Sequence, residues 1–155
     1  MKIMEQLLET LGEHFRGLEG RVDFDDYVHL HGTPIQALLY SGLFLPKLVM
    51  IDDCVLLSWN VADEEAESRF RAALRDPSKT RAEVEASFNL IEVGYLFRPS
   101  SRVTTDDEDI LLASLLCLSW RGWLNTCFPE RNFAVDVLTC EMTGSTAGVQ
   151  FYQVC

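Results

Sequence analysis

A capping box at Thr105–Glu108 opens the most apolar stretch of the chain, residues 106–127. In such a box the threonine and the glutamate each bond the other's backbone amide, which fixes the start of a helix. A helix that is apolar on most sides belongs at the centre of a fold, covered by the other elements. The longest apolar run, Ile110–Trp120, is shorter than the roughly 20 residues of a membrane span, so we expect a soluble protein. The large apolar side chains of this helix are Ile110, Leu111, Leu112, Leu115, Leu116, Leu118, Trp120, Trp123 and Leu124.

Four further helices are predicted from apolar periodicity and helix-start signals. Thr33-Pro34 supplies an N-cap and a first-turn proline, and Thr80-Arg81-Ala82-Glu83 is a second capping box. Residues 22–31 alternate only in part, which predicts a strand or an extended lead-in. The four predicted helices span residues 2–17 (ending near Gly17 and Gly20), 35–44, 63–75 and 80–90.

Two β-hairpins complete the prediction. Residues 47–51 and 54–57 are apolar runs around Asp52-Asp53, and residues 133–140 and 149–154 alternate around Thr143-Gly144-Ser145. The sequence therefore predicts one α+β domain over residues 1–155. In it, a small antiparallel sheet of two hairpins packs against about five helices, one of them central and hydrophobic.

The charge of the chain is strongly negative, because 13 Lys and Arg stand against 24 Asp and Glu, a formal net charge of −11. This excess argues against nucleic acids and anionic membranes as partners, since both repel it. Acids in a first helical turn complement the helix dipole, which explains part of the excess. The rest favours a basic protein partner. The predicted contact residues are Asp52, Asp53, Asp63, Glu64, Glu65, Glu67, Asp106, Asp107, Glu108 and Asp109.

His29 and His31 form the one pair with a spacing seen in metal sites, since on a strand both would lie on one face. Asp23, Asp25 or Asp26 would have to complete such a site. No further ligand has a metal-binding spacing, and the simpler interpretation is two partly exposed polar side chains near a turn. We therefore predict no metal and no cofactor.

The cysteines indicate reduced, mostly buried thiols in a cytosolic protein. Their number is odd, and none forms a Cys-x-x-Cys pair. Cys54 and Cys117 lie inside apolar elements, which predicts inert core thiols rather than nucleophiles. The first residues contain no signal-peptide core, and the phosphate-loop, nucleophile-elbow and zinc-protease motifs do not occur. We therefore predict that the chain is not an enzyme. The five cysteines are Cys54, Cys117, Cys127, Cys140 and Cys155.

Trp120 and Trp123 are one helical turn apart and share a face. Two large aromatic side chains at this spacing usually belong to a core. The alternative is an aromatic anchor at an interface, where Trp and Arg are favoured.

Several segments are similar to small bacterial immunity proteins, which neutralise the secreted toxins encoded beside them. Within this class the chain resembles the immunity partners of type VI secretion nuclease effectors, of the TsiT type. The resemblance implies tight binding to a cognate toxin in the cytoplasm of the producing cell. The segments that carry it are 27–35 (YVHLHGTPI), 45–52 (LPKLVMID), 120–124 (WRGWL), 128–133 (FPERNF) and the ending Phe151-Tyr152-Gln153.

Three hypotheses follow for function. The first is an immunity protein whose acidic surface binds a basic toxin. The second is an acidic secretion chaperone, commonly a homodimer, that holds an effector segment for export. The third is a small metal-dependent enzyme that uses His29, His31 and the nearby acids.

Overall fold

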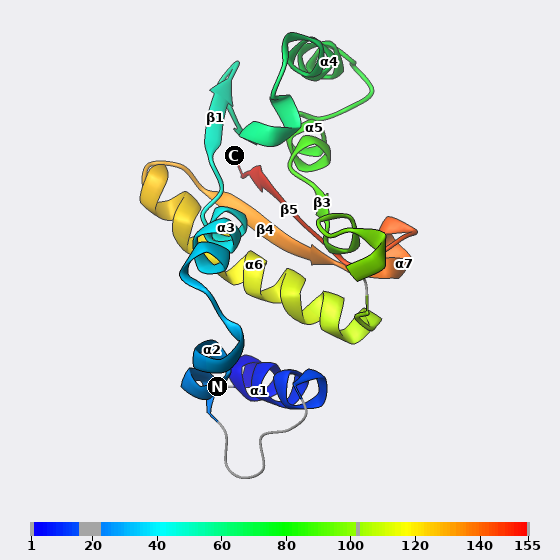
Figure 1. Ribbon diagram of the computed structural model, residues 1–155. Helices are drawn as coiled ribbons and strands as arrows, with labels where there is room; N and C mark the ends of the chain where they lie inside the picture. The colour runs from blue at the N-terminus through cyan, green and yellow to red at the C-terminus, as the bar shows by residue number, and fades with distance from the viewer. Residues whose placement is uncertain (1, 16–22, 102, 155) are drawn as a thin grey trace. The chain divides into compact units, whose positions relative to one another are not determined.

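Helix α6 (Asp106–Cys127) is the longest element of the computed structural model, which describes residues 2–15, 23–101 and 103–154 (Figure 1). It begins where the sequence predicts, because the Thr105 hydroxyl accepts the Glu108 amide at 3.3 Å and the Glu108 carboxylate accepts the Thr105 amide. By length and composition α6 is the one helix of the described chain that meets the requirement for crossing a membrane. Core helices of soluble proteins meet the same requirement.

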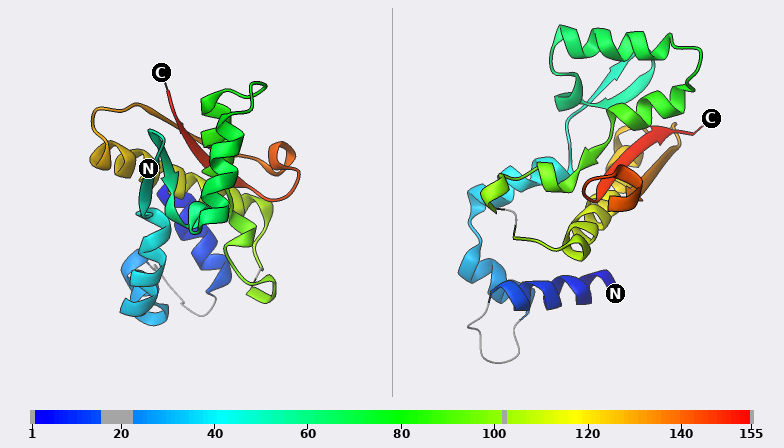
Figure 2. Two further views of the ribbon diagram at one scale, coloured as in Figure 1. Left: turned by 90° about the horizontal axis from the view of Figure 1, so that it is seen from above. Right: turned by 90° about the vertical axis from the view of Figure 1, so that its right-hand side faces the viewer.

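One face of α6 packs against strands β4 (Phe133–Leu138) and β5 (Gly148–Gln153), as Figures 1 and 2 show. Trp120 is buried in this contact, with its ring centroid 5.8 Å from that of Phe151 in an edge-to-face arrangement. Leu118 on another side of α6 is 61% exposed. The buried residues of α6 recur at helical spacing: Ala113, Leu116, Cys117, Trp120 and Leu124.

The larger sheet is antiparallel, with the strand order β3-β5-β4. The predicted C-terminal hairpin is confirmed, with Val135 opposite Phe151. Its connection also holds the short helix α7 (Cys140–Thr143), which ends at Gly144 with φ 75°, a backbone conformation that favours glycine. Strand β3 (Ile91–Glu92) was not predicted, because two residues are too few for an alternating pattern.

The smaller sheet is the predicted hairpin of β1 (Leu48–Ile51) and β2 (Cys54–Leu57). Asp52 and Asp53 form its turn with φ values of 48° and 67°. These values match a type I′ turn, in which both central residues have positive φ. Asp tolerates this conformation better than most residues do, which explains why an Asp-Asp pair closes the hairpin.

Helices α4 (Glu64–Leu74) and α5 (Arg81–Phe88) confirm the predictions for residues 63–75 and 80–90. They pack on the inner face of the β1–β2 hairpin, where the buried residues Cys54, Leu56, Phe70 and Val84 form one cluster. Phe70 and Phe88 meet edge to face at 5.0 Å. Short 3-10 turns at Ser58–Val61, Val93–Tyr95 and Pro99–Ser101 connect these elements.

Two buried polar residues at the C-terminal end of α5 join the two sheets. Asn89 accepts the Leu57 amide at 2.9 Å and donates to the carbonyls of Val55 (2.9 Å) and Phe151 (3.2 Å). Glu85 accepts the backbone amide and the side-chain amide of Gln153, both at 2.7 Å. The side chains of α5 therefore satisfy backbone groups of β2 and β5 that would otherwise need a further strand.

The chain divides into two compact units, residues 1–43 and 44–155, and the prediction of a single domain stays a prediction. The N-terminal unit contains α1 (Lys2–His14), α2 (Phe24–His31) and most of α3 (Pro34–Phe44). Helix α3 confirms the prediction for residues 35–44, and the Gln36 amide donates to the Thr33 hydroxyl at its start. The predicted end of the first helix near Gly17 and Gly20 lies outside the described residues.

The predicted strand or extended segment over residues 22–31 is wrong, because residues 24–31 form helix α2. Asp23 and Asp26 form a capping box, in which the Asp23 carboxylate accepts the Asp25 amide at 3.1 Å and Asp26 accepts the Asp23 amide at 3.2 Å. These local hydrogen bonds nucleate a helix. They outweigh the partial alternation of apolar residues.

We expect Asn89→Ala to lower the free energy of unfolding by about 2 to 4 kcal/mol, because it leaves buried backbone groups of both sheets without partners. Urea denaturation followed by circular dichroism measures this. The matched control is Asn125→Ala on the exposed part of α6, which should change stability by less than about 0.5 kcal/mol. Equal effects of the two substitutions would contradict the bridging role of Asn89.

Candidate functional site

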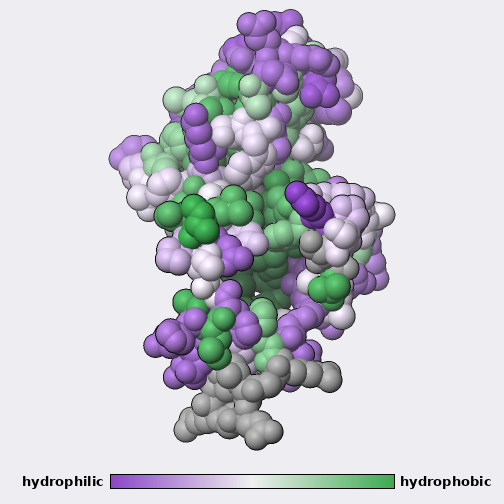
Figure 3. Space-filling model, in the orientation of Figure 1, coloured by the Kyte–Doolittle hydropathy of each residue, from purple (hydrophilic) through white to green (hydrophobic). Residues whose placement is uncertain are grey.

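The acidic residues predicted to contact a partner lie at three places: the β1–β2 turn and the N-terminal ends of α4 and α6. Figure 3 shows that the surface over α4 is largely hydrophilic. Most of these side chains are exposed, but their surroundings differ. Some of these carboxylates bond other groups of this chain, whereas others have no ion pair within the described residues.

The acids that begin α4 and α6 are partly used as helix caps. Asp63 accepts the Ala66 amide at 2.8 Å, Glu108 completes the capping box of α6, and Asp109 accepts the Thr104 hydroxyl at 2.8 Å. Glu67 forms an ion pair with Arg71 at 2.7 Å, one helical turn further along α4. Four of the predicted contact residues are therefore explained by local structure.

The Asp52-Asp53 turn is held by three arginines from distant parts of the chain. Arg71 of α4 donates to the Asp52 carboxylate at 3.2 Å, and Arg81 of α5 donates to the Asp52 carbonyl at 2.8 Å. Arg131, between α6 and β4, donates to both the carbonyl and the carboxylate of Asp53. We call this group of Asp52, Asp53, Arg71, Arg81 and Arg131 the arginine clamp.

Arg131 connects the arginine clamp to the interior. Its guanidinium also donates to the side-chain oxygen of Gln153, whose side-chain nitrogen donates to the Asp53 carbonyl at 3.0 Å and to buried Glu85. A continuous set of hydrogen bonds thus runs from a fully buried carboxylate to the exposed turn. The clamp stabilises two positive-φ residues that would otherwise be strained.

The charge balance in the arginine clamp lowers the pKa of Asp53 below its ordinary value of 3.8. The main causes are the hydrogen bond from Arg131 and the positive charge of that residue. Asp53 is therefore ionised and paired at neutral pH. The two turn acids are matched by cations of the same chain, which makes them weaker candidates for contact with a basic partner.

Four predicted contact residues have no ion pair within the described part of the chain: Glu64, Glu65, Asp106 and Asp107. All four are exposed in the first turns of their helices. The helix dipole stabilises them there. Their negative charge still faces solvent and is available to a cation from another molecule.

The structure removes the geometric basis of the histidine hypothesis. His29 and His31 lie on helix α2, where residues two apart point to different sides. His31 stacks on Phe15 with ring centroids 4.3 Å apart. Among the described residues, no three His, Cys, Asp or Glu side chains form a group able to hold a metal ion.

The cysteines lie in surroundings that differ in reactivity. Burial, with a smaller contribution from the Glu85 hydrogen bond, raises the pKa of Cys54 to about 12. Burial also raises the pKa of Cys117, whose thiol donates to the Val135 carbonyl at 3.3 Å. Cys127 is exposed, and Cys155 lies outside the described residues.

The tryptophan pair belongs mostly to the core. Trp120 is buried against Phe151, as the core interpretation expects. Trp123 is half-buried and donates its indole N–H to the Pro46 carbonyl at 2.9 Å. This hydrogen bond ties α6 to the segment that leads into β1.

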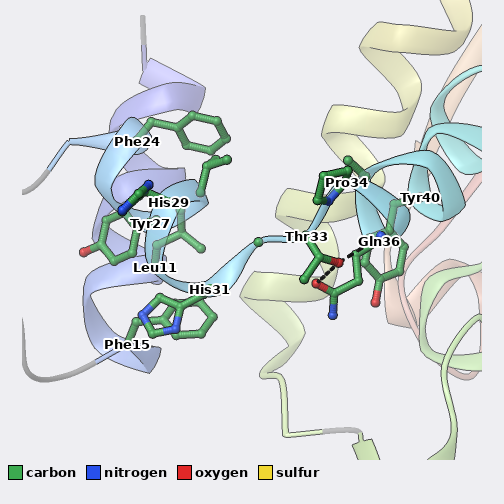
Figure 4. A pocket seen from close by; sticks show the side chains of 13 residues that line it. Leu11, Phe15, Phe24, Tyr27, His29, His31, Thr33, Pro34, Gln36 and Tyr40 are labelled. Carbon is green, nitrogen blue, oxygen red and sulfur yellow. Dashed lines mark hydrogen bonds between the residues drawn. The ribbon is translucent and has the colours of Figure 1, made fainter.

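An apolar hollow of about 760 Å³ lies within the N-terminal unit (Figure 4). Apolar surface is contributed by Leu11 of α1, by Phe15 just after it, by Tyr27 and Val28 of α2, and by Ala37 of α3. Its polar groups are few, and Thr33 and Gln36 are hydrogen-bonded to each other at 3.0 Å. A hollow of this size and lining suits apolar side chains of a bound segment.

The arginine clamp was not predicted from the sequence. Its arginines are 19, 29 and 78 residues from the acids that they contact, so no local pattern connects them. Among the ion pairs of the described residues, only Glu67–Arg71 has a helical spacing that sequence alone can reveal. No family model, curated protein or solved structure matches the chain, and the resemblance to immunity proteins stays a prediction.

We expect the stability difference between the native chain and Asp53→Asn to depend on pH. Because the pKa of Asp53 is lowered in the folded state, its ionic contribution is present above pH 3.8 and is lost as the pH falls through the lower folded value. Asn also tolerates positive φ, so the substitution isolates the charge. Thermal unfolding at pH 7 and below pH 3.8 should show a gap that narrows in acid. A gap independent of pH would show that the ion pair with Arg131 does not stabilise the turn.

Alkylation should separate the cysteines of the native protein. With iodoacetamide at pH 8, we expect Cys54 and Cys117 to react at least about 100-fold more slowly than Cys127, because only the thiolate attacks. Peptide mass spectrometry before and after unfolding in guanidinium measures the rates at each position. Rapid labelling of native Cys54 would contradict the prediction that Cys54 is an inert core thiol.

Proposed function

We propose that this chain is an immunity protein, which binds and neutralises a cognate secreted toxin through the acidic starts of α4 and α6. One observation carries the proposal: Glu64, Glu65, Asp106 and Asp107 are exposed without an ion pair in the described structure, on a chain with a net charge of −11. The arginine clamp uses three of the chain's cations elsewhere. The proposal assigns the toxin contact to these two pairs of carboxylates, Glu64 with Glu65 and Asp106 with Asp107.

The chemistry of a nuclease toxin fits such a surface. A nuclease must attract nucleic-acid phosphates, so it carries a basic surface at its substrate site. Exposed carboxylates attract the same surface and can raise the association rate constant towards about 10⁸ M⁻¹s⁻¹ at low salt. An acidic surface needs nothing more than this complementarity to occlude a basic cleft. The proposal places the protein in the cytoplasm of the producing cell.

A secretion chaperone is the second candidate, and the apolar hollow of the N-terminal unit favours it. Leu38 and Leu39 of α3 are also exposed, so this unit offers apolar surface to an effector segment. The two functions differ in a simple way. An immunity protein suppresses toxicity, whereas a chaperone binds a non-catalytic segment and promotes export.

The proposal predicts that location, and not only total charge, decides binding of the toxin. We choose the product of the neighbouring gene as the toxin to test. The variant Glu64→Gln/Glu65→Gln/Asp106→Asn/Asp107→Asn should bind it with an association rate constant at least about tenfold lower at low salt, and should protect co-expressing cells poorly. Stopped-flow binding and cell survival measure these two effects.

The matched control is Glu5→Gln/Glu9→Gln/Glu130→Gln/Glu141→Gln, which removes four other exposed carboxylates. Both variants have a net charge of −7 (−11 + 4). Equal loss of binding in both would contradict the proposed surface. Binding of the gene product without any protection by the native chain would contradict immunity and support the chaperone.

A further inference from the structure

Side chains bond some of the outward backbone groups of three strands. Asn89 bonds outward backbone groups of β2. Past the end of β3, Asn89 and Glu85 bond backbone groups of β5. Arg121 donates to the outward carbonyl of Val135 in β4 at 2.7 Å. Proteins cover strand edges in this way because an open edge is a template for another strand. Within the described residues, no side chain bonds the outward backbone groups of β1.

The outer edge of β1 has no partner within the described residues. The Ser58 amide donates to the Lys47 carbonyl, which fixes the alternation of the backbone hydrogen bonds. The backbone amides and carbonyls of residues 47, 49 and 51 therefore point towards β2, and those of residues 48 and 50 point away from it. On β2, the residues opposite these two are Leu57 and Val55. Their backbone groups also point away from the hairpin, because they bond the Asn89 side chain. The amides and carbonyls of Leu48 and Met50 therefore lie along an open edge.

Apart from its short length of four residues, β1 itself lacks the features that usually prevent pairing. Its four residues, Leu48–Ile51, include no charge, no proline and no glycine. Met50 is 56% exposed, and the half-buried Val49 and Ile51 form one border of the core cluster under α4. An added strand would extend that cluster by covering Val49 and Ile51.

We infer that a second copy of this chain pairs along β1. The two β1 strands would run antiparallel about a two-fold axis at Val49, which gives the strand order β2-β1-β1-β2 across the two copies. Leu48 then lies opposite Met50 of the second copy, and about four backbone hydrogen bonds form. Val49 meets Val49 of the second copy, so both core clusters gain apolar cover.

The charges at the ends of β1 are compatible with pairing to a second copy of the chain. Lys47 has no ion pair in the described structure. In the paired arrangement it lies diagonally across from Asp53 of the second copy, within reach of a long side chain.

Salt dependence separates this contact from the proposed toxin contact. Two copies with a net charge of −11 each repel one another, and salt screens this repulsion. The self-association should therefore strengthen with salt, whereas binding to a basic partner should weaken. The inference is independent of the proposed function.

Sedimentation velocity of the purified full chain tests the inference at about 50 mM and about 500 mM NaCl. We expect a concentration-dependent dimer with Kd near 1–100 μM, about tenfold tighter at the higher salt. Met50→Pro removes an amide that the monomer does not use, and should abolish the dimer. The matched control Met50→Thr keeps that amide and should still dimerise. Circular dichroism checks that each variant is folded.

Lys47→Glu gives a second test that does not alter the strand backbone. It replaces attraction to Asp53 of the second copy with repulsion and should weaken the dimer at least about tenfold. A chain that stays monomeric at about 300 μM in high salt would overturn the inference. So would a dimer that folded Met50→Pro retains, because it would have to use another surface.

Discussion

The fold of residues 44–155 depends on two buried polar side chains of one helix. An isolated two-stranded hairpin is marginally stable in water, so β1 and β2 need to be joined to the rest of the unit. Glu85 and Asn89 are one helical turn apart on the α5 segment, and between them they bond backbone groups of β2 and β5. A buried carboxylate is costly unless it is hydrogen-bonded, and Glu85 accepts two amides from Gln153. Because hydrogen bonds require a set distance and direction, these bonds restrict the position of the hairpin against the larger sheet more than apolar packing would.

The same hydrogen bonds extend to the surface and determine how the chain uses its few cations. Gln153 bonds Arg131, and Arg131 bonds Asp53 at a turn whose positive φ values need support. The arginine clamp is therefore part of the folding of the hairpin. Of its three arginines, Arg81 and Arg131 pair only with the turn acids, whereas Arg71 also pairs with Glu67 near the start of α4. The exposed negative charge thus follows from structural needs in the core, and this link between core and surface is the basis of the proposed function.

The sequence predicted the elements whose signals are local. Capping boxes located α5 and α6, apolar runs around Asp52-Asp53 located the first hairpin, and two-residue alternation located the second. Local signals failed at α2, where the Asp23–Asp26 box outweighed partial alternation, and at β3, which is too short to show a pattern. The roles of Asn89 and Arg131 were unpredictable, because their partners are distant in sequence. The acidic clusters are local and were predicted. Which of their carboxylates pair with arginines was not predicted, because those arginines are distant in sequence.

Net charge alone cannot describe the surface of this protein, because its exposed features differ in what they attract. The acidic helix starts attract cations, and their attraction is long-ranged and weakened by salt. The edge of β1 offers backbone groups and apolar side chains, which act only at contact and are insensitive to screening. Pairing through β1 would bring two chains of −11 together and so double the negative charge offered to a basic partner. Such a dimer would be disfavoured at low salt, yet each dimer formed would attract a cationic protein more strongly than a single chain does.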